Sequence, residues 1–293
     1  MSHQSTIRFI INPTSGPKSR QDVAALIALH LDKNKYRHEI VYTAHAGHAT
    51  DLAKEAADKG CNIVVAVGGD GTVNEVARGL LYSETALAIL PKGSGNGLAR
   101  HLLVPLNIKG ALRIINRGYT SFIDSGNING HPFFTTAGIG FDAYISSVFA
   151  GNSKRGLKTY VQLVLKEVMK YRHLPIKATI NGSVFDSDCY VMAFANAAQY
   201  GNNAYIAPMA NIQDGMLDVC LVRQLNFRKA LHLSYCMLTK QLATDSAEYF
   251  QTNAVEVETE QEIMYHADGD FMGKASRFSV HMEPKSLKVV VPA

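Results

Sequence analysis

Three glycines around one aspartate make up the stretch of this chain best suited to chemistry, Gly68-Gly69-Asp70-Gly71-Thr72-Val73-Asn74-Glu75. Glycine lets the backbone turn sharply and approach a ligand closely, because no Cβ stands in the way. Where such a turn opens a helix, free N–H groups and the positive end of the helix dipole create an anion site. An aspartate in an anion site implies a cation between the two negative charges. The motif therefore predicts a nucleotide phosphate bound together with Mg²⁺.

The elements around this motif predict a parallel α/β fold. Residues 63–67 are an unbroken apolar run, typical of a strand buried on both faces of a parallel sheet. A helical pattern starts near Thr72. The same alternation recurs along the first 100 residues, which predicts a sheet with helices on both faces. The other strands are expected at 7–11, 39–43 and 86–90, and the other helices near 23–31, 52–57 and 98–103.

Polar or glycine-rich segments follow all of these predicted strands. Ligands of parallel sheets bind beyond the carboxyl ends of the strands, so one sheet edge is expected to gather these segments. They are Asn12-Pro13-Thr14-Ser15-Gly16, Thr43, Gly68 to Thr72, and Gly93-Ser94-Gly95-Asn96-Gly97.

Familiar nucleotide fingerprints do not explain these loops. The chain lacks the GxxxxGK[ST] pattern of a P-loop. Its GxGxxG/A match, Gly138 to Ala143, lacks the acidic residue that a dinucleotide site places about 20 positions later. We therefore treat this match as chance.

Composition indicates a globular protein with a sizeable core. The chain has 293 residues, 47% hydrophobic and 18% charged, enough for one large domain or two ordinary ones. A net charge of +4 gives no case for nucleic-acid binding. The four cysteines are far apart and form no CxxC pair, which argues against a disulfide or metal-thiolate framework. With no signal-peptide core and no run of about 18 apolar residues, the sequence predicts a cytoplasmic protein that can still touch a membrane surface.

The second half of the chain reads as a β-rich domain. From about residue 121, short strands follow one another closely, which predicts a sandwich-like antiparallel architecture. A hairpin is expected around Asn181-Gly182. Further strands are expected at 189–195, 217–223, 255–260, 263–266 and 278–282, and helices at 157–171 and 227–242. We therefore predict a nucleotide-binding domain over residues 1–120 and a β-rich domain over residues 121–283.

The loops resemble the diacylglycerol kinase catalytic-domain family, which includes soluble bacterial lipid kinases, sphingosine kinases and ceramide kinases. The matching segments are Asn12 to Gly16, Gly68 to Glu75 and Leu90 to Arg100, and the resemblance covers nearly the whole chain. It implies a Rossmann-like first domain, as in NAD kinases and phosphofructokinases, to which residues 284–293 return. It also implies phosphoryl transfer from ATP, with Mg²⁺, to a lipid hydroxyl, with the lipid met at a membrane surface.

The same resemblance implies roles for particular residues. Asp70 would act beside Mg²⁺ and the phosphates, and Asp124 would join the magnesium–water network. The Asp268-Gly269-Asp270 turn would supply the general base, and the residues leave open which of the two aspartates it is. The ATP-binding residues would be Asn12, Pro13, Thr14, Ser15, Gly16, Thr43, Gly68, Gly69, Asp70, Gly71, Thr72, Asn74, Glu75, Ser94 and Asn96.

The resemblance also implies a structural magnesium site. The Asp214 carboxylate would bind Mg²⁺ together with the backbone carbonyls of Asn211 and Met216. Oxygen ligands of this kind suit Mg²⁺, with waters completing an octahedron. An ordinary Asp-Gly turn without metal is the alternative.

Two departures from the family pattern leave the substrate open. Gly97 stands where bacterial diacylglycerol kinases usually carry an aspartate, and Gly93 to Asn96 is closer to sphingosine kinases. Asp270 stands where the family has a glutamate. The lipid is therefore left open between diacylglycerol, sphingoid bases and related lipids, and a homodimer is also open. The alternative functions are an NAD kinase and a nucleotide-binding regulatory protein without catalysis.

Overall fold

A computed structural model describes residues 4–15, 22–151 and 157–293. The chain divides into two compact units. Unit 1 comprises Met1–Ile123 and Lys285–Ala293, and unit 2 comprises Asp124–Pro284.

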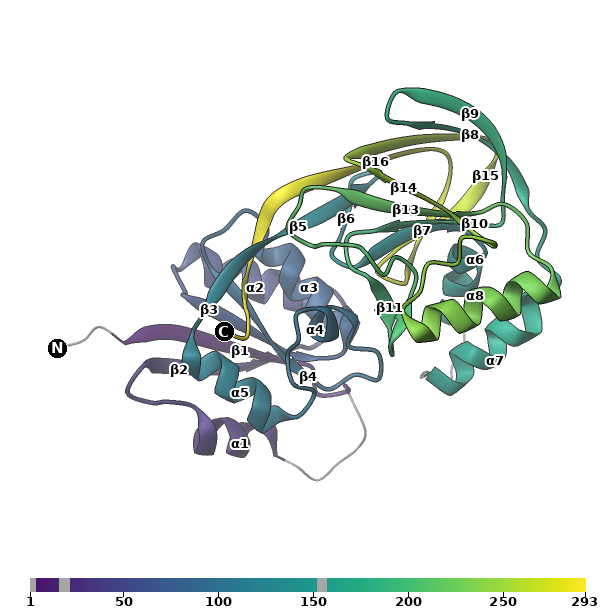
Figure 1. Ribbon diagram of the computed structural model, residues 1–293. Helices are drawn as coiled ribbons and strands as arrows, with labels where there is room; N and C mark the ends of the chain where they lie inside the picture. The colour runs from purple at the N-terminus through teal and green to yellow at the C-terminus, as the bar shows by residue number, and fades with distance from the viewer. Residues whose placement is uncertain (1–3, 16–21, 152–156) are drawn as a thin grey trace. The chain divides into compact units, whose positions relative to one another are not determined.

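Unit 1 contains the predicted parallel sheet. Its strand order is β16-β4-β3-β1-β2, in which the last residues of β16 lie parallel to β4 and every other neighbouring pair is also parallel. Helices α2 and α3 lie on one side of this sheet, and α1 and α5 lie on the other (Figure 1). The strands are β1 (Ser5–Ile11), β2 (Tyr36–Tyr42), β3 (Ile63–Gly68), β4 (Ala86–Pro91) and the end of β16 (Asp270–Val290), whose residues up to Pro284 belong to unit 2. The helices are α1 (Val23–His30), α2 (His48–Asp58), α3 (Asp70–Leu80), α4 (Gly97–His101) and α5 (Ile108–Arg117).

Two helices of unit 1 differ from the prediction. Helix α3 begins at Asp70, earlier than expected, because Gly69 is its extended N-cap and an acidic residue in a first turn is favoured by the helix dipole. Helix α4 ends at His101, since the backbone turns at Leu103, which has a φ of +56°. Helix α5 was not predicted.

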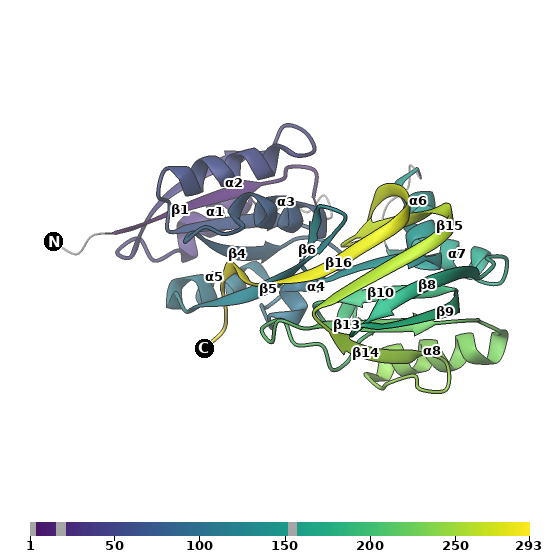
Figure 2. The ribbon, with the colours of Figure 1, turned by 90° about the horizontal axis from the view of Figure 1, so that it is seen from above.

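Unit 2 is the β-rich sandwich that the sequence predicts. One layer runs β14-β13-β10-β7, and the long strand β15 pairs with β7 near its end and with β8 near its start. Strand β15 also pairs with β16, and Figure 2 shows these two strands side by side. The sheet therefore folds over a shared apolar core that includes Phe194, Leu217 and Phe278. The strands are β5 (Thr120–Ile128), β6 (His131–Phe133), β7 (Thr136–Gly140), β8 (Leu174–Ile180), β9 (Ser183–Cys189), β10 (Val191–Ala195), β11 (Gln199–Gly201), β12 (Ala204–Tyr205), β13 (Leu217–Val222), β14 (Glu248–Thr252) and β15 (Ala254–Ala267).

The opposite face of the β14-β13-β10-β7 layer carries a second core. Strand β10 alternates accordingly: Met192 and Phe194 belong to the first core, and Ala193 belongs to the second. Helices α6 (Phe141–Ala150), α7 (Leu157–Glu167) and α8 (Phe227–Thr239) accompany this second core (Figure 1). Among the described residues, no helix is both long and apolar enough to cross a membrane.

Several predicted elements of unit 2 have other bounds. The strands expected at 255–260 and 263–266 are one strand, β15, with an irregular register between Glu258 and Ile263. The strand expected at 278–282 is likewise part of a longer strand, β16, which continues to Val290. Cys189 ends β9, so β10 starts only at Val191. Helices α7 and α8 stop earlier than predicted, and α6 was not predicted.

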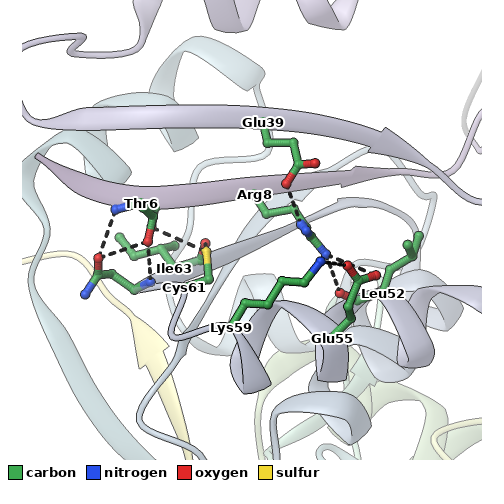
Figure 3. Close-up of polar contacts among 9 residues, drawn as sticks. Thr6, Arg8, Glu39, Leu52, Glu55, Lys59, Cys61 and Ile63 are labelled. Atoms are coloured by element: carbon green, nitrogen blue, oxygen red, sulfur yellow. Dashed lines mark hydrogen bonds and ion pairs between the residues drawn. The ribbon is translucent and has the colours of Figure 1, made fainter.

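Arg8 is a buried charge on β1 that ties three elements of unit 1 together (Figure 3). Its guanidinium bonds to Glu39 of β2 at 2.8 Å and to the Leu52 carbonyl of α2 at 3.2 Å, with Glu55 at 3.6 Å. The hydrogen bond from Lys59, and then the charge of Arg8, lower the pKa of Glu55.

Replacing Arg8 with methionine should lower the free energy of unfolding by about 1–3 kcal/mol, because the variant loses these bonds. Thermal unfolding measures the effect. Arg37→Met, at an exposed position of β2, is the control and should leave the melting temperature unchanged. Equal melting temperatures for the two variants would show that the Arg8 contacts contribute nothing.

Candidate active site

Two glycine loops of unit 1 touch at the carboxyl edge of the sheet. Gly69 follows β3 and Gly93 follows β4. A Cβ added to Gly93 would lie 2.6 Å from the Gly69 Cα, and one added to Gly69 would lie 3.2 Å from the Gly93 Cα. Any side chain at Gly93 would push the loops apart, so glycine is required for their close approach.

Asp70 joins the same two loops through its carboxylate. Its Oδ2 accepts a hydrogen bond from the Asn96 N–H at 2.9 Å, and its Oδ1 accepts one from the Gly97 N–H at 2.6 Å. Asp70 therefore caps the start of α4, a role that the sequence did not predict. Each carboxylate oxygen has a second lone pair, which can still meet a cation or its waters.

The loop after β1 is linked to the same edge. Asn12 donates from Nδ2 to the Thr72 hydroxyl at 3.1 Å, and its Oδ1 accepts from the Thr14 N–H at 3.0 Å. Thr72 is almost fully buried, and its side chain fills the space beside Gly68, where a Cβ would lie 2.4 Å from the Thr72 Oγ1. Three of the four predicted loops thus form one connected surface.

The remaining predicted ATP residues divide into exposed and buried ones. Pro13, Thr14, Gly71 and Ser94 are exposed, and Ser15 and Thr43 are half-buried. Gly16 lies outside the described residues. Asn74 is buried, and its Nδ2 has no hydrogen-bond partner among the described residues.

Glu75 has a structural task. Its carboxylate caps α2, accepting from the Gly47 N–H at 2.9 Å and the Ala49 N–H at 3.2 Å. Both oxygens are engaged at the start of a helix that runs beside α3.

In unit 2, the two aspartates of the Asp268-Gly269-Asp270 turn differ sharply. The Asp268 carboxylate accepts hydrogen bonds from the Phe134 N–H at 2.9 Å, the Thr135 N–H at 2.7 Å and the Thr136 N–H at 3.2 Å, and also from the Thr135 hydroxyl. Burial raises the pKa of Asp268, although these donors oppose the shift. Asp270 is exposed at the start of β16. The Asp268 carboxylate is thus held by several donors, whereas Asp270 lies on the surface of the turn.

Asp124 is buried on β5 and fixed to the loop before β13. Its Oδ2 accepts from the Gly215 N–H at 2.7 Å, and its N–H donates to the Ile212 carbonyl at 2.8 Å. The fully buried Asn196 then donates from Nδ2 to the Asp124 and Phe134 carbonyls, each at 2.9 Å. Asn196 thereby connects Asp124 to the segment that binds Asp268.

The predicted structural metal loop contains a suitable set of oxygens. The Asp214 Oδ1 accepts from the Met216 N–H at 2.9 Å, and the exposed Asn211 lies in the same loop. Nearby, the buried Asp218 Oδ2 has no hydrogen-bond partner among the described residues. Burial, and then the charge of Asp214, raise the pKa of Asp218 to about 6. An orphaned carboxylate oxygen beside a second carboxylate fits a cation in this loop.

Apart from residues 1–3, 16–21 and 152–156, the chain has no group of three or more His, Cys, Asp or Glu that could hold a metal. A cation held by the Asp214 and Asp218 carboxylates with backbone oxygens would involve only two such side chains, too few to form a group of this kind.

Sequence reasoning missed Thr135, Asn196 and His266. Thr135 and Asn196 lie in no recognisable motif, and their partners come from distant parts of the chain. His266 stands two residues before Asp268, and this proximity to the acidic turn was the available signal.

Comparison with known proteins finds a matching family for each half of the chain. Residues 6–128 match the Diacylglycerol kinase catalytic domain family, and residues 135–291 match the YegS C-terminal NAD kinase beta sandwich-like domain. A diacylglycerol kinase structure from Bacillus anthracis str. Sterne shares the fold, with a TM-score of 0.78 at 21% identity over 100% of this chain and 98% of that chain.

Two curated relatives align over most of their length. The diacylglycerol kinase of Bacillus subtilis (strain 168) is 27% identical over 292 residues, covering 97% of this chain and 96% of the relative. The diacylglycerol kinase of Mycobacterium tuberculosis (strain ATCC 25618 / H37Rv) is 32% identical over 278 residues, covering 89% and 87%. With both units matched, the chain belongs to the diacylglycerol kinase family of lipid kinases, which are phosphotransferases.

Proposed function

We propose that this lipid kinase transfers the γ-phosphoryl group of ATP, with Mg²⁺, to the hydroxyl of a diacylglycerol- or sphingoid-type lipid. The supporting observation is the connected glycine surface of unit 1, in which Gly69 meets Gly93 and Asp70 binds the loop of Asn96. Backbone N–H groups at the start of α3 suit phosphate oxygens. Unit 1 would supply the nucleotide site, and unit 2 would supply the base.

Asp270 is the proposed general base. Its carboxylate accepts the proton of the lipid hydroxyl as that oxygen bonds to the γ-phosphorus and the bond to the β-phosphate oxygen breaks, giving the phosphorylated lipid and ADP. Asp268 holds the turn. Asp70 and Asp124 would offer oxygens to magnesium or its waters, and bound Mg²⁺ would neutralise charge on the phosphates.

Incubation of the protein with labelled ATP, Mg²⁺ and a total lipid extract tests the proposal. Label should enter a lipid whose identity then names the substrate, and parallel reactions with diacylglycerol, sphingosine and ceramide should agree. Label transferred to NAD would show an NAD kinase instead. If no acceptor is labelled, a regulatory protein without catalysis is the better description.

The structural metal proposal has its own test, independent of activity. Millimolar Mg²⁺ should raise the melting temperature by about 2–4 °C, because a cation that binds only the folded Asp214 loop stabilises it. Asp214→Asn should remove most of this shift. An equal shift in the variant would place the ion elsewhere.

We also propose that the lipid is met at an anionic membrane surface. Helix α8 and its end expose an apolar stripe at helical spacing, comprising Phe227, Leu231, Tyr235, Leu238 and Leu242. Helix α7 and its end add Val161, Leu165 and Met169. Residues 157–173 and 226–242 contain seven lysines and arginines against a single acid, Glu167. Exposed apolar side chains among cations suit an anionic bilayer.

The double substitution Leu231→Ser with Leu238→Ser should weaken binding to phosphatidylglycerol vesicles by about tenfold or more, since two apolar anchors are lost. Vesicle co-sedimentation measures this binding. Leu29→Ser, at an exposed position of α1, is the matched control and should bind like the unmodified protein. Undiminished binding by the double variant would show that these side chains do not contact the membrane. If the double variant instead failed to form a dimer that the unmodified protein forms, the surface would be assigned to a contact with a second copy of the chain.

A further inference from the structure

The segment Gly138 to Ala143, treated above as a chance match, forms the turn from β7 into α6. It brings Asp142, in the first turn of α6, against His266 of β15, with 3.1 Å between the Asp142 Oδ2 and the His266 Nε2. A Cβ on Gly138 would lie 2.4 Å from that oxygen and 2.9 Å from that nitrogen. Glycine at position 138 therefore leaves the space that this pair occupies.

Both ring nitrogens of His266 are engaged. The Gly269 N–H lies 3.2 Å from the His266 Nδ1. Because a backbone N–H can only donate, Nδ1 is the acceptor and the ring proton resides on Nε2, where it is donated to Asp142. His266 is thus a neutral bridge from Asp142 to the acidic turn.

Further hydrogen bonds fix the position of the Asp142 carboxylate. Its Oδ2 also accepts from the Tyr200 hydroxyl at 3.1 Å, and its Oδ1 accepts from the Ala143 N–H at 2.8 Å. His266 is 2% exposed and Asp142 is 9% exposed. A buried network whose members are satisfied holds its geometry rigidly.

The turn itself is a two-residue Asp-Gly hairpin loop, a type that requires positive φ at both residues. Asp268 and Gly269 both have positive φ, +51° and +83°, and they connect Ala267 to Asp270, which pair across the hairpin. The Asp268 carboxylate is tied to the segment Phe134 to Thr136. His266 supplies the tether to Gly269, the residue next to Asp270.

We infer that His266 is a positioning residue for Asp270, acting through the Gly269 N–H and anchored by Asp142. The inference rests on the proposed function, in which Asp270 is the base. Without the tether, the turn and the Asp270 carboxylate would shift relative to the lipid hydroxyl. Misplacement of a reacting group by about 1 Å can cost on the order of 100-fold in rate.

Two amide substitutions separate the halves of the bridge. In His266→Asn, the side-chain oxygen lies near the former Nδ1 and can still accept from Gly269. In His266→Gln, the amide nitrogen lies near the former Nε2 and can still donate to Asp142, but the tether to Gly269 is lost. We expect kcat to fall about 10- to 100-fold in His266→Gln and to fall clearly less in His266→Asn, which keeps the tether to Gly269 but loses the bond to Asp142, with the KM for ATP unchanged in both.

Tyr200→Phe is the matched control, because it removes another bond to the Asp142 carboxylate without touching the turn. Its kcat should stay near that of the unmodified protein. A similar kcat for both His266 variants and the unmodified enzyme, or an equal loss in both, would overturn the inference. If the unmodified protein labels no lipid, the proposed function fails instead.

Hydrogen exchange of the Gly269 amide gives a readout that does not depend on activity. Measured by NMR on the full chain, this amide should exchange faster in His266→Gln and remain protected in His266→Asn. If the Gln variant does not fold, Gly138→Ala, which crowds the Asp142–His266 pair, should produce the same faster exchange and a lower kcat. Unchanged Gly269 protection in the variant that folds would contradict the tether.

Discussion

Asp270→Asn should lower kcat by about 10²- to 10⁴-fold while leaving the melting temperature almost unchanged, because we propose this side chain as the general base and it is exposed, outside the core. Asp268→Asn should instead lower the stability of the fold. Its amide would place an N–H₂ group among donors that now bind a carboxylate, at a cost of about 1–3 kcal/mol in the free energy of unfolding.

Lipid kinase assays and thermal unfolding of the two variants measure the contrast. Asp270→Glu keeps a carboxylate at this position, on the longer side chain that the family usually carries. It should therefore retain most of the turnover that Asp270→Asn loses. If Asp268→Asn kept the unmodified melting temperature and lost turnover, while Asp270→Asn stayed active, the base would be Asp268 and the assignment would be reversed.

Asp70→Asn is expected to reduce turnover by about 10²- to 10³-fold, the scale of removing one preorganised electrostatic contact to the transition state. The sequence alone suggests a purely chemical role. The structure adds that Asp70 holds the loop of Asn96 and Gly97, so the variant should also lose some stability. We expect weaker ATP binding together with a melting temperature lowered by a few degrees.

Steady-state kinetics with varied ATP and calorimetric titration of the nucleotide would measure these effects. Asp51→Asn is the matched control, since it removes the same charge from the first turn of the neighbouring helix α2 at an exposed position. Near-normal turnover in Asp70→Asn would exclude a direct role in phosphoryl transfer.

The alternation of strands and helices in unit 1 was predictable because its signals are local. An apolar run such as 63–67 and the glycine turn that follows it each lie within a few residues. Since all strands of a parallel sheet end at one edge, the gathering of the loops followed from topology. The bounds of β15 and β16 were less predictable, because exposed residues continue a strand when a partner strand supplies the hydrogen bonds.

The sequence by itself determined the family, the fold class and the loops expected to hold a nucleotide. Only the tertiary structure decided the surroundings of each carboxylate. Asp268 and Asp270 carry the same carboxylate two residues apart, yet Asp268 accepts hydrogen bonds from donors more than 130 residues away and Asp270 is exposed. Glu75 caps a distant helix, and Gly138 makes room for a histidine from another strand. Burial and hydrogen-bond partners come from contacts between remote segments, which no local pattern encodes.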